Sequence, residues 1–188
     1  MRVILVCHGE SEIGTLQTSV LEDALLSELD ARRASAIALE LRDNVARRQP
    51  VEAIYSSPLA PALKTASMVA DELNLPPPDR RCTLPALSSR PAREADAASS
   101  LDLLRAVQAG AWEAIEAFRR THAEGAQIVA VTDRLTIHAI VCRALSISIE
   151  EFRRFRIDTG SMTTVAFRQQ RTLLASLNET CHLNGIDG

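Results

Sequence analysis

The chain has 188 residues, of which 46% are hydrophobic and 24% charged, a composition typical of a globular domain with a sizeable core. A formal net charge of −3 gives no indication of nucleic-acid or anionic-membrane binding, and no apolar run is long enough to cross a bilayer. The four cysteines form no CxxC pair and no signal-peptide pattern is present, so we expect reduced thiols, a cytoplasmic protein and no metal or disulfide framework.

Short apolar runs alternate with segments whose apolar residues recur every three or four positions, which predicts alternating strands and helices. Such alternation is typical of a layered α/β fold. In chain order, the predicted elements are a strand over 3–6, a helix over 27–48, a strand over 53–56, helices over 58–73 and 101–121, a strand over 128–131, a helix over 135–145, and a hairpin of strands over 161–168 and 172–177.

Local signals predict where several of these elements begin and end. Ser27 is placed to cap its helix, and Ser57–Pro58 predicts the N-cap and first residue of the next one. The stretch 84–100 has no periodicity and is predicted to be a long loop, and the tail from Thr180 is predicted to be loose. No repeat or linker divides the chain, so we expect one domain over residues 1–188.

The most informative segment directly follows the first predicted strand and reads Cys7-His8-Gly9-Glu10-Ser11. It lies where open α/β sheets place their ligand sites, at the carboxyl end of a strand. The segment resembles the Arg-His-Gly-Glu-Ser/Thr signature of the histidine phosphatase superfamily, whose founding members are the cofactor-dependent phosphoglycerate mutases. Cys7 stands where that signature has arginine.

Further blocks resemble the same family in the same order, over roughly residues 1–167. They are Leu26–Leu29, Ile54–Ala66, Val129–Arg134 and Ile157–Ser161. The resemblance implies a phosphoglycerate mutase-like fold, a three-layer α/β sandwich around a mostly parallel central sheet.

The resemblance also implies a chemistry. The family's first histidine is a nucleophile that becomes a phosphohistidine, and two arginines with a second histidine hold the phosphoryl oxygens. By position, His8 is the retained nucleophile. Cys7 and Pro61 stand at the two arginine positions, Asp133 at the second-histidine position, and Gly14 where many members carry a phosphate-binding asparagine.

The family's general acid, a loop carboxylic acid, has no counterpart in residues 86–89. Glu94 and Asp96 are the nearest carboxylates. Gly9, Glu10 and Ser11 complete the candidate binding residues of the first loop.

Two cations stand close to the lost ones in sequence. Lys64 lies about one helical turn beyond Pro61, and Arg134 follows Asp133 directly. A lysine, however, lacks the planar fork with which arginine binds two phosphate oxygens. We expect His8 and Asp133 to lie close together at the ends of adjacent parallel strands, where a hydrogen bond from the His8 ring to the Asp133 carboxylate would favour a charged imidazole and weaken it as a nucleophile.

The leading functional hypothesis is a catalytically impaired histidine phosphatase homologue that acts by binding a small phosphorylated or anionic ligand or a protein partner. One alternative is a weak phosphomonoesterase that uses His8 as phosphoacceptor. The other is a structural subunit that forms a homodimer. We expect no cofactor, no metal, and no nucleic-acid or membrane partner.

Overall fold

The computed structural model describes residues 1–8, 26–46, 49–78, 84, 100–169 and 171–186. These residues include one five-stranded sheet. In spatial order, its strands are β2 (Ala53–Ser56), β3 (Gln127–Thr132), β1 (Arg2–Cys7), β4 (Met162–Arg168) and β5 (Arg171–Glu179). The strands β2, β3 and β1 run parallel, whereas β4 is antiparallel to β1 and β5 to β4.

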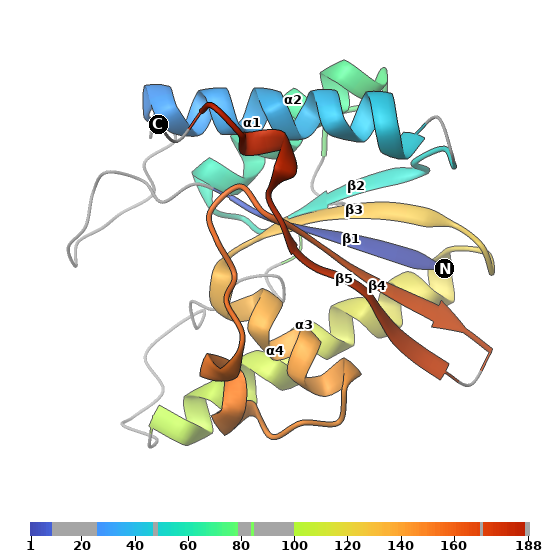
Figure 1. Cartoon of the computed structure of the whole chain (residues 1–188). Helices are drawn as coiled ribbons and strands as arrows, with labels where there is room; N and C mark the ends of the chain where they lie inside the picture. The colour runs from blue at the N-terminus through green and yellow to red at the C-terminus, as the bar shows by residue number, and fades with distance from the viewer. Residues whose placement is uncertain (9–25, 47–48, 79–83, 85–99, 170, 187–188) are drawn as a thin grey trace.

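Helices cover both faces of the sheet (Figure 1). On one face lie α1 (Glu28–Glu40) and α2 (Ala60–Leu73), and on the other α3 (Ser100–Thr121) and α4 (Arg134–Ala144). This arrangement confirms the three-layer α/β sandwich with a mostly parallel centre. Among the helices described, none combines the length and apolarity that a membrane span requires.

The central strands β1 and β3 are apolar over most of their length because both of their faces are covered. Residues 3–7 of β1 and all of β3 are buried. In β1, Val3 and Leu5 pack towards α3 and α4, whereas Ile4 and Val6 pack towards α1 and α2. The continuous apolar runs of the sequence therefore correspond to strands at the centre of the sandwich.

Ser27 caps α1 as predicted, because its Oγ accepts the Asp30 N–H at 3.0 Å. The helix then continues as a π-helical segment, η1 (Leu41–Ala46), and the last two predicted positions, 47–48, lie outside the described residues. The predicted loop 84–100 lies outside them as well, except for Leu84 and for Ser100, which begins α3.

The predicted start of α2 is wrong. The helix begins at Ala60, with Leu59 as N-cap, and Pro61 is the proline of its first turn. Ser57 follows β2 directly and is still bonded to the sheet, since its N–H donates to the Val131 carbonyl at 2.9 Å. Pro58 and Pro61 both suit the first turn of a helix, so the sequence alone does not show which of them begins α2. The hydrogen bond of Ser57 to the sheet places the start of the helix at the later proline.

The prediction of a loose tail is also wrong. The chain beyond β5 forms a 3₁₀ turn, η4 (Cys181–Leu183), and Leu183 is buried. Its side chain closes over Gly160, where an added Cβ would lie 3.1 Å from a Leu183 methyl group and where φ is +79°. The His182 Nε2 lies 2.9 Å from the Gly160 carbonyl oxygen, so the tail holds the turn that precedes β4.

A 3₁₀ segment that the sequence analysis did not predict, η3 (Ile149–Arg154), follows α4. Its N-cap is Ser148, whose Oγ accepts the Glu150 N–H at 3.4 Å. Ile149 of this segment is buried, so η3 extends the layer formed by α3 and α4.

Candidate functional site

The carboxyl ends of β1 and β3 lie side by side. Cys7 is the register partner of Thr132, and the His8 N–H donates to the Thr132 carbonyl at 3.1 Å. His8 and Asp133 are thus the first residues after two adjacent parallel strands, as expected from the sequence. His8 is 9% exposed, so this end of the sheet, which we call the His8 edge, presents a nearly buried imidazole.

A third segment, the turn 158–161, completes this edge. The Cys7 N–H donates to the Ser161 carbonyl at 3.0 Å, and the Gly160 N–H donates to the Cys7 carbonyl at 2.8 Å. These bonds hold the backbone immediately before His8 on the side away from β3. The position of His8 is therefore set by β3 on one side and by this turn on the other.

Asp133 has a structural role that the sequence analysis missed. It is the N-cap of α4, with Oδ1 accepting the Thr136 N–H at 2.9 Å and Oδ2 accepting the Thr136 hydroxyl at 3.1 Å. A carboxylate is favoured here because the N-terminus of a helix carries partial positive charge. The spacing Asp-x-x-Thr after an apolar strand is a capping signal that could have predicted this.

The two positions that the resemblance assigns to arginine hold buried, uncharged side chains. Cys7 is 2% exposed and belongs to the core cluster between the sheet and the α3 and α4 layer, with its Sγ 3.8 Å from the His8 carbonyl oxygen. Pro61 is buried in the first turn of α2. Neither side chain offers a hydrogen-bond fork to a phosphate group.

Arg134 lies at the rim of this edge. Its Nη2 is 3.4 Å from the Thr159 hydroxyl, in the same turn that holds Cys7. Burial opposes ionisation of Asp158 in this turn, but hydrogen bonds from Asn178 and Arg156 and the charges of Arg156 and Arg134 outweigh it and lower its pKa. A cation is thus present beside the His8 edge, although not at either family position.

The other predicted cation, Lys64, lies on the exposed face of α2, one turn beyond Pro61. The remaining candidates lie outside the described residues: Gly9, Glu10, Ser11, Gly14, Glu94 and Asp96. Within the part of the chain that is described, no three His, Cys, Asp or Glu side chains are grouped as metal ligands would be.

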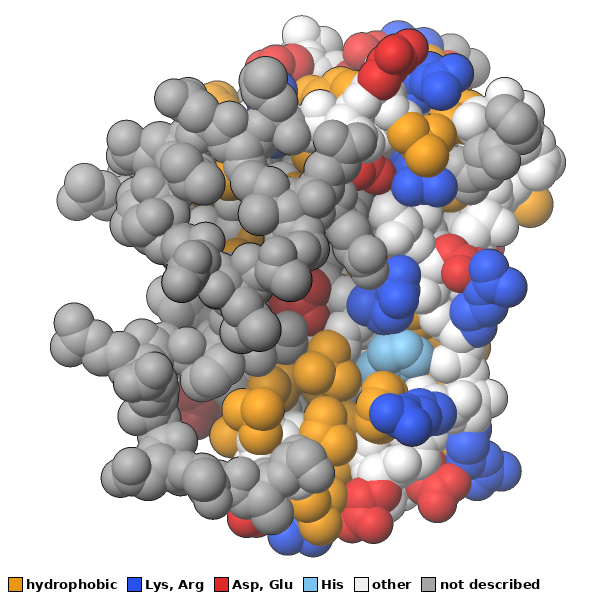
Figure 2. All heavy atoms as spheres, turned by 90° about the vertical axis from the view of Figure 1, so that its left-hand side faces the viewer, with side chains coloured by type: hydrophobic (Ala, Val, Ile, Leu, Met, Phe, Trp, Pro, Cys, Tyr) orange, Lys and Arg blue, Asp and Glu red, His pale blue; other side chains and the backbone are white. Residues whose placement is uncertain are grey.

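An apolar surface borders this edge of the sheet. Figure 2 shows hydrophobic side chains gathered beside segments that are not described. The partly buried apolar residues of the α3, α4 and η3 region are Leu101, Leu104, Leu135, Phe152 and Phe155. Beneath them His138 packs against both phenylalanine rings, and burial together with the Arg134 charge lowers its pKa to about 4. His138 is therefore a neutral core residue near pH 7.

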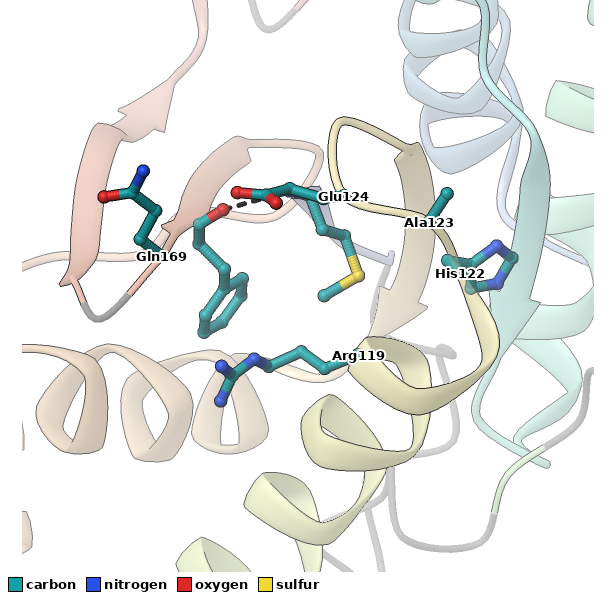
Figure 3. Close-up of a pocket in the computed structure, with 7 residues that line it drawn as sticks. Arg119, His122, Ala123, Glu124 and Gln169 are labelled. Carbon is teal, nitrogen blue, oxygen red and sulfur yellow. Dashed lines mark hydrogen bonds between the residues drawn. The ribbon is translucent and has the colours of Figure 1, made fainter.

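A separate cavity of about 210 Å³ lies at the opposite end of the strands, where β1 and β3 begin. Figure 3 shows Arg119, His122, Glu124 and Gln169 around it. The His122 side chain is 11% exposed, and its Nε2 lies 2.8 Å from the Tyr55 hydroxyl oxygen. This cavity is remote from His8 and shares no lining residue with the His8 edge.

Comparisons with known proteins agree with this geometry. Phosphoserine phosphatase 1 of Hydrogenobacter thermophilus is 28% identical to this chain over 207 residues, covering 97% of this chain and 94% of the relative. Two solved structures share the fold. A phosphoserine phosphatase from Entamoeba histolytica has a TM-score of 0.73 at 21% identity, covering 97% of this chain and 98% of that one. A mycobacterial glucosyl-3-phosphoglycerate phosphatase has a TM-score of 0.71 at 20% identity, covering 95% and 99%.

The family model of the histidine phosphatase superfamily (branch 1) matches residues 3–82 and 83–180. These ranges take in both strands that form the His8 edge, the turn 158–161 and all four α-helices of the sandwich. The chain belongs to the histidine phosphatase superfamily (branch 1).

Proposed function

We propose that this protein is a histidine phosphatase homologue whose phosphoryl-transfer activity is strongly impaired, and that its His8 edge binds a small ligand rather than cleaving it. The observation that carries the proposal is the Asp133 carboxylate, held at the end of β3 by two hydrogen bonds from Thr136. The resemblance places a histidine at this position to hold the phosphoryl group.

The first argument is electrostatic. A carboxylate about 4 Å from a phosphate anion would raise the energy of the complex by about 4 kcal/mol at an effective dielectric constant of ~20. At ~1.4 kcal/mol per decade, such repulsion corresponds to roughly three decades in rate. The capping bonds favour the present orientation, so turning the Asp133 side chain away would cost the N-cap of α4.

The second argument concerns hydrogen-bond donors. The N-terminus of a helix at this edge of an α/β sheet is an anion site, because its first N–H groups are unpaired. Here Asp133 itself accepts the Thr136 N–H and hydroxyl. These donors are satisfied within the protein and are not available to a phosphate oxygen.

The third argument is the loss of both arginines. A charge-assisted hydrogen bond contributes ~1.5–3 kcal/mol. Cys7 and Pro61 supply none, and both side chains are buried. Together with Asp133, three of the groups that the family uses to hold phosphate are absent from the positions where the resemblance expects them.

One observation favours the alternative of a weak phosphomonoesterase. The Arg134 guanidinium lies against Thr159, in the turn that holds Cys7, and is a described cation that could approach a phosphate at His8. In that case small phosphomonoesters are the substrates to test, and phosphoserine is the first choice because two of the relatives are phosphoserine phosphatases.

The experiment is a hydrolysis assay on an aryl phosphate and on phosphoserine, with the wild type, His8→Ala and the matched control His122→Ala. His122 is nearly as buried as His8 but lies at the opposite end of the strands, where β1 and β3 begin. We expect the three proteins to show the same negligible rate. Turnover of ~1 s⁻¹ or more that disappears only in His8→Ala would overturn the proposal and establish the phosphomonoesterase.

A further inference from the structure

The two outermost strands of the sheet, β2 and β5, differ in whether their outer sides are paired. The strand β2 at one edge has four residues, and the Leu84 N–H donates to its Ser56 carbonyl at 2.9 Å. The strand β5 at the other edge has nine residues, and no described element pairs with its outer side (Figure 1). An open strand of this length presents unpaired backbone donors and acceptors to another chain.

The outer strand lacks two of the residue types that usually protect against such pairing. Edge strands are commonly blocked by lysine or proline, and β5 contains neither. Its Leu173 is 44% exposed, the highest value among the large apolar side chains that the structure describes. The strand is therefore both open and apolar at its surface.

The register with β4 shows which β5 side chains share a face. Met162, Thr164, Ala166 and Arg168 alternate along β4, so they point to one side of the sheet, the side on which Met162 packs towards α1 and α2. Their partners on β5 point to the same side. These partners are Glu179, Ser176, Leu173 and Arg171.

The charges of this face are self-complementary. Arg171 and Glu179 stand at the two ends of β5, both are exposed, and neither has an ion-pair partner among the described residues. We propose that β5 pairs antiparallel with β5 of a second copy, so that Arg171 of each copy faces Glu179 of the other and Leu173 faces Ser176. A parallel arrangement would instead place like charges opposite one another, which is destabilising.

The irregularities of β5 are compatible with this pairing. The bulge leaves Ala175 without a partner on β4, and Asn178 has φ of 52°, so the chain bends just before Glu179. We expect the backbone ladder over 172–177, flanked by the two ion pairs. One strand pair is smaller than a standard interface, so the dimer depends on concentration. The inference does not rest on the proposed function and stands if the protein is an active phosphatase.

The first test is sedimentation velocity of the full chain over a concentration series up to about 1 mM, where the corresponding association free energy is ~4 kcal/mol. A reductant is present because Cys181 is exposed and a disulfide would mimic association. We expect a monomer–dimer equilibrium that is weakened at least about tenfold by Leu173→Lys. The matched control Leu103→Lys changes a leucine of similar exposure, 41%, on α3, and should leave the equilibrium unchanged.

The second test examines the register by charge exchange. Arg171→Glu and Glu179→Arg should each weaken the dimer by about tenfold, because each change places like charges opposite one another twice per dimer. The double variant should restore wild-type association. A monomer at every concentration, a dimer that is indifferent to Leu173→Lys, or a double variant that stays as weak as the single ones would each overturn the proposal.

Discussion

Asp133 stabilises α4 and, in our proposal, also repels phosphate, and two substitutions separate these roles. Asp133→Ala removes the acceptor of the Thr136 N–H, which costs about 1 kcal/mol, and leaves the fully buried Thr136 hydroxyl without its acceptor, which costs about as much again. Asp133→Asn keeps an oxygen for the Thr136 N–H, loses the charge, and replaces the oxygen at the Thr136 hydroxyl by an amide NH2 that can donate to the hydroxyl oxygen instead. Asparagine and aspartate cap helices about equally well, so its cost should stay near 0.5 kcal/mol.

The effect on ligand binding should be the same for both variants. Removing a unit charge about 4 Å from a bound anion is worth at most ~4 kcal/mol at an effective dielectric constant of ~20, and solvent reduces this. We therefore expect both Asp133→Ala and Asp133→Asn to bind phosphate or vanadate at least about tenfold more tightly than the wild type. The control Asp71→Asn makes the same charge change near the end of α2, away from His8, and should change neither quantity.

The two roles are measured separately. Calorimetric titration with inorganic phosphate and with vanadate gives the affinity, and thermal unfolding gives the stability. For a chain of this size about 2 kcal/mol corresponds to a fall of roughly 4–8 °C in Tm, which we expect for Asp133→Ala alone. If phosphate affinity is unchanged in Asp133→Asn, the carboxylate does not act on the ligand site and the central argument for impairment is lost.

Three further predictions concern stability. Because the pKa of folded His138 is about 4 against an ordinary 6.5, the unfolded state takes up the proton first, so unfolding free energy should fall by about 2–3 kcal/mol as pH drops from 6.5 to 4. Urea unfolding at both pH values should show a smaller fall in His138→Leu. Leu183→Ala should lower stability by about 2–4 kcal/mol, measured by urea unfolding, because it opens the contact with Gly160, whereas a truly loose tail would give no change. Cys7→Arg should cost more than about 3 kcal/mol because it buries an unpaired cation, and a Tm equal to that of Cys7→Ser would show that the side chain leaves the core.

The three-layer fold could be predicted from the sequence because each layer has a local pattern of apolar residues. A strand covered on both faces must be apolar at every position, and the runs at 3–6 and 128–131 are. The tail left no such signal. Leu183 is a single apolar residue beyond the last strand, and its partner Gly160 lies 23 peptide bonds and one hairpin earlier in the chain, so only the folded sheet brings them together.

The candidate site was predictable in its composition but not in its geometry. The motif placed His8 and Asp133 after two strands, and the adjacency of those strands then followed from the fold. What the motif could not supply was the direction of the Asp133 side chain, because an aspartate before a helix has two competing partners, the helix and a ligand. The capping geometry settles this competition in favour of Thr136.

That outcome explains how the replacement of a phosphate-binding histidine can be stable. A helix N-terminus that binds phosphate keeps its first N–H groups unpaired until the ligand arrives, which costs stability in the free protein. The Asp133 side chain pairs one of these groups, the Thr136 N–H, and places a negative charge where the helix favours one. The same two hydrogen bonds thus stabilise α4 and occupy two donors that a phosphate could use, the Thr136 N–H and hydroxyl, so in our proposal stability is gained at the expense of phosphate binding.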